Sequence, residues 1–227
     1  DLCMAAVAHY GWYNRCAAVN PYLVEGKKTV SLEICEQLGF RAPDRVYVSV
    51  GDGCTIAGVY KGFAEMHALG LTDRVPRIIG VQAEGAQAIK RAFEQNAPIV
   101  EVVSGPAETI ADSISVGVPR NPIKAVEAVR KSDGYYLAVR DAEILEAMKF
   151  MGKKLGIFGE PAGVTGFAGF QRDLRAGAID AQEEVAVIVS GNGLKDVETA
   201  IRATGDPPLV PPTLEGLTRF LAEPQAS

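Results

Sequence analysis

The feature that most constrains the fold is an alternation of short β-branched runs with longer amphipathic segments. Residues 46–50 (Val-Tyr-Val-Ser-Val) form an apolar run bounded by turn-forming residues, a pattern that predicts a buried strand. A helical pattern follows over about 55–69, and a second strand-like run covers 77–83. An order of strand, helix and strand predicts parallel strands that are connected by helical crossovers.

The same order continues along the chain. Further helices are expected over 28–38, 86–95, 122–132, 141–154 and 161–175, a loop over 104–122, and strands over 135–139 and 184–189. We therefore predict an α/β fold with an open, mostly parallel twisted sheet flanked by helices, in which 46–50, 77–83 and 185–189 are buried strands.

The two ends differ from this pattern. Residues 1–20 are rich in alanine and end at Asn20-Pro21, which predicts the end of one element and the start of a loop, because proline restricts the residue before it. Residues 206–212 are rich in proline, and the leucines that follow them have helical spacing, which predicts a linker and a terminal helix.

Composition excludes several classes of protein. The 227 residues are 48% hydrophobic and 22% charged, as in folded globular proteins. The net charge is −5 and no segment concentrates Lys or Arg, so no nucleic-acid partner is expected. The apolar runs are strand-sized and far shorter than the roughly 20 residues that cross a bilayer, so no membrane span is expected.

The cysteines indicate a reducing compartment. Cys3, Cys16, Cys35 and Cys54 show no C-x-x-C spacing, so we expect reduced thiols, a cytoplasmic protein and no metal site. The first residues lack both a signal peptide and an initiator methionine. We expect the chain to begin inside a longer protein.

The most informative segment is a glycine-containing turn, Gly51-Asp52-Gly53-Cys54-Thr55, between the first predicted strand and its helix. Backbone N–H groups at the start of a helix are unpaired and lie at the positive end of the helix dipole, so this turn can bind a phosphate. Its spacing matches neither the dinucleotide fingerprint nor the Walker loop. An ordinary loop in which Thr55 caps the helix is an equally good interpretation of these residues.

A second glycine-containing turn, 190–196, follows the last predicted strand. The carboxyl ends of parallel strands share one edge of a sheet, so both turns are expected to border one crevice. The alternative is a surface connection of hairpin type. Ser190 opens this turn, and its hydroxyl can donate or accept a hydrogen bond, which suits a neutral heteroaromatic nitrogen.

Two other features favour structural explanations. Glu160-Pro161 precedes a predicted helix, and both residue types suit a helix start, so plain capping is the favoured interpretation. His9 and His67 are the only histidines, and neither adjoins a nucleophile motif. No histidine-dependent triad is expected.

Four stretches together resemble the threonine synthase family, whose members have the tryptophan-synthase-β-like fold, or fold type II of the pyridoxal-phosphate (PLP) enzymes. They are residues 20–29, similar to the family's N-P-x-R-x-E-G-x-K-T; 50–56, at the position of its phosphate loop, with 76–83 after it; 156–162; and 190–196, similar to T-G-H-G-L-K-D. Their order and spacing agree over about residues 18–203.

The resemblance implies a cofactor, a reaction and a domain layout. PLP would bind through Gly51, Asp52, Gly53, Cys54 and Thr55, with Ser190 facing the pyridine nitrogen. The implied enzyme is a carbon–oxygen lyase of threonine biosynthesis that converts O-phosphohomoserine and water to threonine and phosphate, and homodimers are common in the family. Residues 1–20 would end a small N-terminal domain or connector, 21–205 would form the large PLP-binding domain, and 206–227 the linker and terminal helix.

The sequence departs from the family in three respects. The lysine that binds PLP covalently lies in an S-F-K-D-R-like motif upstream of 20–29, and none of the ten lysines here has that context. Leu23 replaces the family's arginine, and Asp52, Cys54 and Thr55 replace asparagine, glycine and asparagine. No catalytic residue is therefore assigned within this chain, which is expected to be inactive without its own N-terminal segment.

These departures leave two alternatives. One is another fold type II amino-acid lyase, such as a threonine dehydratase, a diaminopropionate lyase or a cysteate synthase, which the leucine at position 23 favours. The other is a non-catalytic fragment that binds an anion.

Overall fold

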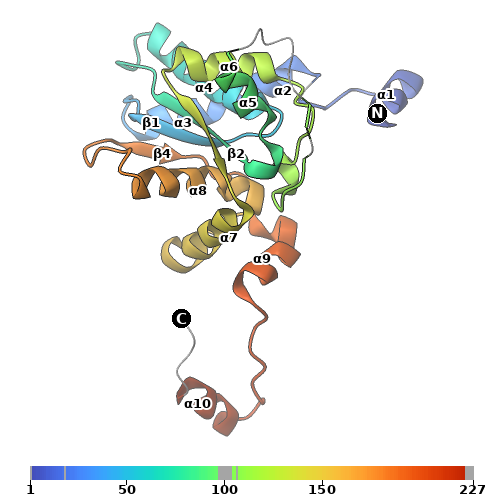
Figure 1. Cartoon of the computed structure of the whole chain (residues 1–227), viewed down its shortest axis with the longest axis vertical. Coiled ribbons are helices and arrows are strands. Elements are labelled where there is room, and N and C mark those ends of the chain that lie inside the picture. Colours follow the sequence, from blue (N-terminus) through green and yellow to red (C-terminus); the bar gives the residue numbers. More distant parts are fainter. Residues whose placement is uncertain (1, 18, 97–103, 106, 223–227) are drawn as a thin grey trace.

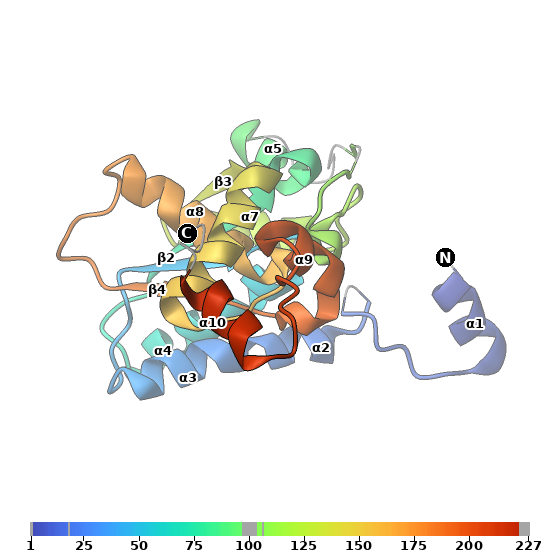
Figure 2. The ribbon, with the colours of Figure 1, turned by 90° about the horizontal axis from the view of Figure 1, so that it is seen from below.

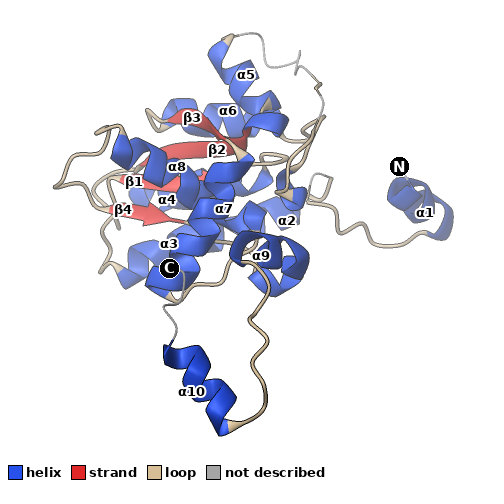
Figure 3. Ribbon diagram, turned by 60° about the horizontal axis from the view of Figure 1, so that its bottom comes forward, coloured by secondary structure: helices blue, strands red, loops and turns tan. Residues whose placement is uncertain are grey.

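The computed structural model describes residues 2–17, 19–96, 104–105 and 107–222. Within these residues the sheet has four strands in the order β3-β2-β1-β4, and all the pairings are parallel (Figures 1 and 3). The strands are β1 (Arg45–Ser49), β2 (Arg77–Ala83), β3 (Tyr135–Val139) and β4 (Val185–Val187). The predicted fold class is confirmed.

Helices cover both faces of the sheet (Figure 3). One face carries α3 (Thr29–Gln37), α4 (Cys54–Ala68), α5 (Ala88–Glu94) and α6 (Pro122–Lys131); the other carries α7 (Asp141–Phe150), α8 (Pro161–Arg175) and α9 (Val197–Thr204). Alternate residues of β1 serve the two cores: Val46 and Val48 pack with α4 and α6, and Tyr47 packs with α7 and α8. This burial on both faces explains why the strands are nearly continuous apolar runs.

A buried polar network joins the second layer of helices to the sheet. Asp173 of α8 is buried and accepts hydrogen bonds from the hydroxyls of Tyr47, at 2.6 Å, and Tyr135. Arg45 donates to the Tyr135 hydroxyl at 3.1 Å and forms an ion pair with Glu183 at 2.7 Å. A buried carboxylate is costly unless it is paired, so these partners hold α8 against β1 and β3.

Several predicted boundaries change. β1 spans 45–49 and not 46–50, and the helix expected over 141–154 is α7 followed by a π-helical turn, Met151–Leu155. The helix expected over 86–95 begins with a 3₁₀ turn, Glu84–Ala86, and becomes α-helical only at Ala88. Residue 106 of the loop expected over 104–122 lies outside the described residues.

The prediction that 185–189 is a buried strand is wrong. β4 covers only Val185–Val187, and its residues are half-buried. β4 pairs with β1 alone and is last in the sheet order, so its outer side has no neighbouring strand within the described residues.

The loop predicted after Asn20-Pro21 is also wrong, because a short helix, α2 (Pro21–Glu25), begins there. The Asn20 side chain accepts a hydrogen bond from the Tyr22 N–H at 3.0 Å, and proline suits the first helical position. Beyond these elements, α1 (Leu2–Tyr10) stands away from the body of the molecule (Figures 1 and 2), and the predicted terminal helix α10 (Leu214–Ala222) stands below it in Figure 1. None of the described helices is long and apolar enough to span a bilayer.

Candidate active site

The sheet order places a topological switch point at the carboxyl ends of the neighbouring strands β1 and β4. The chain leaves β1 through α4 to reach β2 on one side, and it returns after β3 to place β4 on the other side of β1. The two neighbouring strands are parallel and pair Arg45 with Val185 and Tyr47 with Val187. Ligands of open α/β sheets bind at such a switch point, outside the carboxyl ends of the strands.

A cavity of about 260 Å³ lies at this position. It is lined by Ala17, Lys27, Ser49, Val50, Gly51, Asp52, Gly53, Cys54, Thr55, Ile56, Ser113, Ile114, Glu160, Ala162 and Ser190. The prediction that the turn 51–55 and Ser190 border one crevice is therefore confirmed. Lys27, Ser49, Ser113 and Glu160 line the same cavity, although the sequence did not predict them as site residues.

The turn presents the start of α4 to the cavity. Gly53 is the N-cap residue, with φ of 88°, and the Ala57 N–H donates to the Gly53 carbonyl oxygen at 3.3 Å. The N–H groups of Cys54, Thr55 and Ile56 precede this first bond and have no partner inside the helix. An anion can use these donors. The alternative in which Thr55 caps the helix is wrong, since α4 begins at Cys54 without a side-chain cap.

Gly53 is required by packing as well as by its backbone conformation. A Cβ atom there would lie 2.7 Å from the Ala125 Cβ and 2.8 Å from the Asn121 carbonyl oxygen. Its positive φ also disfavours any residue with a side chain. The glycine therefore lets α6 approach the turn closely.

The Asp52 carboxylate has its own partner. Its Oδ1 accepts a hydrogen bond from the Arg120 N–H at 3.0 Å, and the Asp52 carbonyl oxygen accepts one from the Asn121 N–H at 3.0 Å. Because the Asp52 carboxylate is hydrogen-bonded to a backbone N–H outside the turn, the N–H groups at the start of α4 can bind a phosphate. Asp52 therefore does not prevent phosphate binding at this turn.

Cys54 contributes a neutral thiol. Its side chain is buried at the first position of α4, and this burial, followed by the charge of Asp52, raises its pKa above the ordinary 9.0, while the charges of Lys27 and Lys124 act in the opposite direction. The thiol is therefore protonated at neutral pH. It adds no negative charge to the cavity.

Ser190 lines the same cavity as the turn and lies three residues after the end of β4, the strand that neighbours β1. It is exposed, and within the described part of the chain its hydroxyl has no hydrogen-bond partner. A Cβ atom at Gly163, in the first turn of α8, would lie only 1.6 Å from the Ser190 carbonyl oxygen. Gly163 therefore allows the backbone of Ser190 to sit directly against α8.

Glu160 does more than the capping predicted for it. It is the N-cap residue of α8 and Pro161 occupies the first position, as expected, but the Glu160 side chain makes no capping bond. Instead the buried carboxylate pairs with the Lys195 ammonium at 3.0 Å, and Lys195 also donates to the Ser113 hydroxyl. This pair joins the second glycine-containing turn to α8 and neutralises a carboxylate at the cavity.

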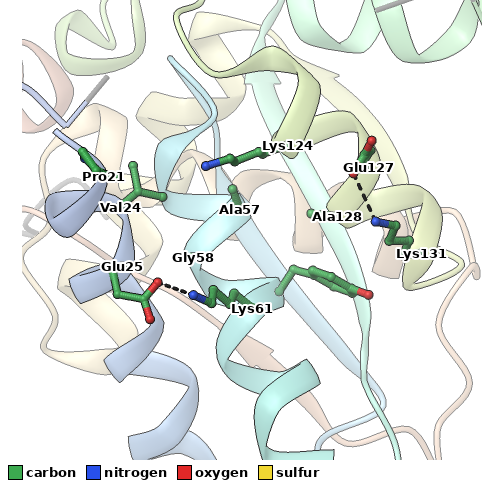
Figure 4. A pocket seen from close by; sticks show the side chains of 11 residues that line it. Pro21, Val24, Glu25, Ala57, Gly58, Lys61, Lys124, Glu127, Ala128 and Lys131 are labelled. Carbon is green, nitrogen blue, oxygen red and sulfur yellow. Dashed lines mark hydrogen bonds and ion pairs between the residues drawn. The ribbon is translucent and has the colours of Figure 1, made fainter. Parts of the chain in front are cut away.

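A second and larger cavity, of about 460 Å³, lies between α2, α4 and α6 (Figure 4). Small residues, Ala57, Gly58 and Ala128, form part of its lining. Most of its charges are paired with one another, Glu25 with Lys61 and Glu127 with Lys131. None of the predicted site residues lines it. The cavity at the switch point is therefore the candidate site.

Comparison with known proteins identifies close relatives. The threonine synthase of Methanocaldococcus jannaschii is 42% identical over 206 residues, which cover 91% of this chain and 51% of that protein. The threonine synthase of Mycobacterium tuberculosis is 41% identical over 197 residues, or 86% of this chain and 51% of that protein. The chain thus spans about half the length of the curated relatives it matches.

Solved structures share the fold. A processed threonine deaminase isoform of Solanum lycopersicum has a TM-score of 0.68 at 24% identity, over 82% of this chain and 50% of that chain. A diaminopropionate ammonia lyase of Escherichia coli has a TM-score of 0.69 at 18% identity, over 90% of this chain and 55% of that chain. These likenesses place the sheet and its helices in fold type II.

The family model matches most of the chain. Residues 1–191 fit the family described as "Pyridoxal-phosphate dependent enzyme". This range includes the whole sheet, the turn 51–55 and Ser190. The chain belongs to the pyridoxal-phosphate-dependent enzyme family.

Proposed function

We propose that this chain is the cofactor-binding part of a carbon–oxygen lyase, a threonine synthase that converts O-phosphohomoserine and water to threonine and phosphate. The observation that carries the proposal is the single cavity at the switch point, where the turn 51–55 and Ser190 meet. These residues lie in two of the four stretches that resemble threonine synthases, and relatives with that name are about 40% identical over most of the chain.

The residues present fit PLP. The unpaired N–H groups at the start of α4 suit its phosphate, and Asp52 is already engaged by Arg120. The Ser190 hydroxyl, which has no hydrogen-bond partner among the described residues, suits the pyridine nitrogen, to which it can donate a hydrogen bond without transferring a proton. PLP, when bound, supplies an electron sink for reactions at the carbons of an amino acid.

Contacts at and behind the cavity wall fix the shape of the site. The Glu160–Lys195 ion pair fixes the turn that carries Ser190 against α8, and Gly163 permits the close approach. The neutral Cys54 thiol closes the cavity beside the phosphate turn without adding charge. These contacts fix the walls of the cavity that would hold the cofactor, and we assign the covalent lysine to a segment outside this chain.

The proposal extends to the rest of the protein. Residues 21–205 form the large PLP-binding domain, residues 1–20 form the end of a small N-terminal domain or a connector, and residues 206–227 form a linker and terminal helix. The whole protein is a cytoplasmic homodimer that acts on a small amino-acid substrate, and this chain alone is inactive. The matched region covers only about half the length of the relatives, which supports the assignment of the smaller domain and the covalent lysine to a segment outside this chain.

The second candidate function is another fold type II lyase. Leu23, half-buried on α2, supplies no cation where the resemblance places an arginine. Arginine binds phosphate through a bidentate fork, which leucine cannot replace. A substrate without phosphate, such as threonine or diaminopropionate, would fit this difference.

The test compares substrates on the complete protein that contains this chain. It is incubated with PLP and O-phospho-L-homoserine, threonine or 2,3-diaminopropionate, and the threonine, phosphate, keto acid and ammonia formed are measured. Equal amounts of threonine and phosphate from the first substrate support the proposal. Keto acid and ammonia from the other two substrates, with no threonine formed, support the second candidate. The absence of any turnover contradicts both.

A further inference from the structure

Lys27 is a cavity residue whose position is fixed by the fold. It lies in the 3₁₀ turn Gly26–Lys28, between α2 and α3, and it lines the same cavity as the turn 51–55. A Cβ atom at Gly58 of α4 would lie 2.7 Å from the Lys27 Cβ. This glycine therefore brings Lys27 against the first turns of α4.

The charge of Lys27 is unused within the described residues. Its neighbour Lys28 forms ion pairs with Glu25 at 2.6 Å and Glu65 at 2.7 Å, whereas no carboxylate of the described residues lies within ion-pair distance of Lys27. The two carboxylates that line the cavity have other partners, the Arg120 N–H for Asp52 and Lys195 for Glu160. Within the described part of the chain, half-buried Lys27 is thus left without a counter-ion in the cavity that contains the turn 51–55.

The charge balance of the turn calls for a cation. A phosphate monoester carries about −1.5 to −2 charges at neutral pH. The start of a helix supplies only about +0.5 of a charge, and Asp52 contributes a negative charge within the turn itself. A lysine is a compact point charge that binds phosphate well. The positive charge of Lys27 already acts on the Cys54 thiol at the first position of α4.

We infer that Lys27 is the side-chain counter-ion of the cofactor phosphate held at the turn 51–55, and so determines how tightly this chain binds PLP. This inference rests on the proposed function for the location of PLP. It assigns to Lys27 a phosphate-binding role and no part in the bonds that change.

Lys124 provides a matched control. It too lacks an ion-pair partner within the described residues, and its charge also acts on Cys54. However, it extends from α6 into the other cavity, where it reaches across Ala57 toward α2 (Figure 4). The K124Q substitution therefore removes one positive charge near the start of α4, as K27Q does, but it removes no residue of the candidate site.

The experiment titrates the purified chain and its K27Q, K27R and K124Q variants with PLP, inorganic phosphate and pyridoxal. Binding is followed by the NMR shifts of the backbone N–H groups of residues 51–56. We expect K27Q to weaken the binding of PLP and of inorganic phosphate by about tenfold or more. K27R, K124Q and all pyridoxal titrations should stay within about twofold of the unsubstituted chain.

The outcomes separate the inference from the proposed function. Equal PLP binding by K27Q and the unsubstituted chain overturns the role of Lys27 and leaves the proposed function standing. Lys27-dependent binding of phosphate, with PLP bound no better than phosphate, supports the role of Lys27 and contradicts the proposed function. If neither PLP nor phosphate shifts residues 51–56, both are overturned.

Discussion

At the scale of the residue, the candidate site depends on glycines that permit close packing and on the hydroxyl of Ser190. Gly53 and Gly163 let neighbouring segments approach to distances that a side chain would prevent. Ser190 also lines the cavity, and its hydroxyl has no hydrogen-bond partner among the residues that the structure describes. Specific roles for these residues lead to two predictions.

Gly53→Ala should destabilise the fold. The added Cβ meets Ala125 at 2.7 Å in a backbone conformation with φ of 88°, so we expect the free energy of unfolding to fall by about 2 kcal/mol or more. Urea denaturation followed by circular dichroism measures this change. Gly152→Ala is the control, since a Cβ at Gly152 meets no atom within 4 Å. Equal stability of the two variants would contradict the packing argument.

Ser190→Ala should weaken PLP binding without changing stability. The loss of one hydrogen bond to the pyridine nitrogen corresponds to about 1 kcal/mol, or about a fivefold rise in the dissociation constant. Fluorescence titration with PLP measures this, and the melting temperature should be unchanged because Ser190 is exposed. The exposed Ser104, which does not line the cavity, provides the control S104A. Unchanged affinity in S190A would remove Ser190 from the cofactor site.

At the scale of the element, the attachment of α8 to the sheet depends on a few buried groups. Tyr47 and Tyr135 both donate to Asp173. Burial, followed by the hydrogen bond to Asp173, raises the pKa of each tyrosine above its ordinary 10.0. The unfolded chain therefore loses these protons at a lower pH than the folded chain does. The contribution of these two tyrosines to the free energy of unfolding is complete below about pH 10 and is lost as the pH rises above that value.

Tyr47→Phe should change both stability and its dependence on pH. At pH 7 we expect the free energy of unfolding to fall by about 1 to 2 kcal/mol, because Asp173 loses a hydrogen bond. Between pH 10 and 11 the variant should lose about 1 kcal/mol less stability than the unsubstituted chain, because Tyr47 loses its proton in this range in the unfolded chain but not in the folded one. Urea denaturation at a series of pH values measures both effects. Tyr22→Phe, on an exposed side chain, should match the unsubstituted chain; equal slopes for Y47F and Y22F would contradict this account.

At the scale of the whole molecule, local sequence patterns predicted the layers but not the boundaries of the site. The apolar run of β1 and the glycine-containing turn after it are continuous in sequence, so strand, turn and helix could all be predicted there. The half-buried state of β4 could not, because it depends on the position of β4 beside β1 at the edge of the sheet. The helix α9 was not predicted, because it is only eight residues long and directly follows the glycine-containing turn.

The same limit applies to the site. The turn 51–55 and Ser190 carried glycines at strand ends, a signal that is visible in the sequence. Glu160 had only a weak signal, its place before a proline at the start of a helix. Lys27 had none, because the packing of its turn against Gly58, and the lack of a nearby carboxylate, arise from contacts between distant segments.

The chain by itself should not bind PLP covalently in stoichiometric amounts. None of its ten lysines lies in the sequence context of the covalent lysine, although Lys27 lines the cavity. After incubation with PLP and reduction with borohydride, mass spectrometry of the intact chain should show only substoichiometric labelling spread over several lysines. Stoichiometric labelling of one lysine, together with turnover of an amino acid, would place the covalent lysine inside this chain.

One cavity at the switch point should hold PLP between the turn 51–55 and Ser190, and a crystal structure of the chain grown with PLP can show this. We expect the phosphate within hydrogen-bond distance, roughly 3 Å, of the N–H groups of Cys54, Thr55 and Ile56, and the pyridine nitrogen at a similar distance from the Ser190 Oγ. PLP bound in the cavity between α2, α4 and α6, or with its phosphate away from the start of α4, would show that the cavity at the switch point is not the cofactor site.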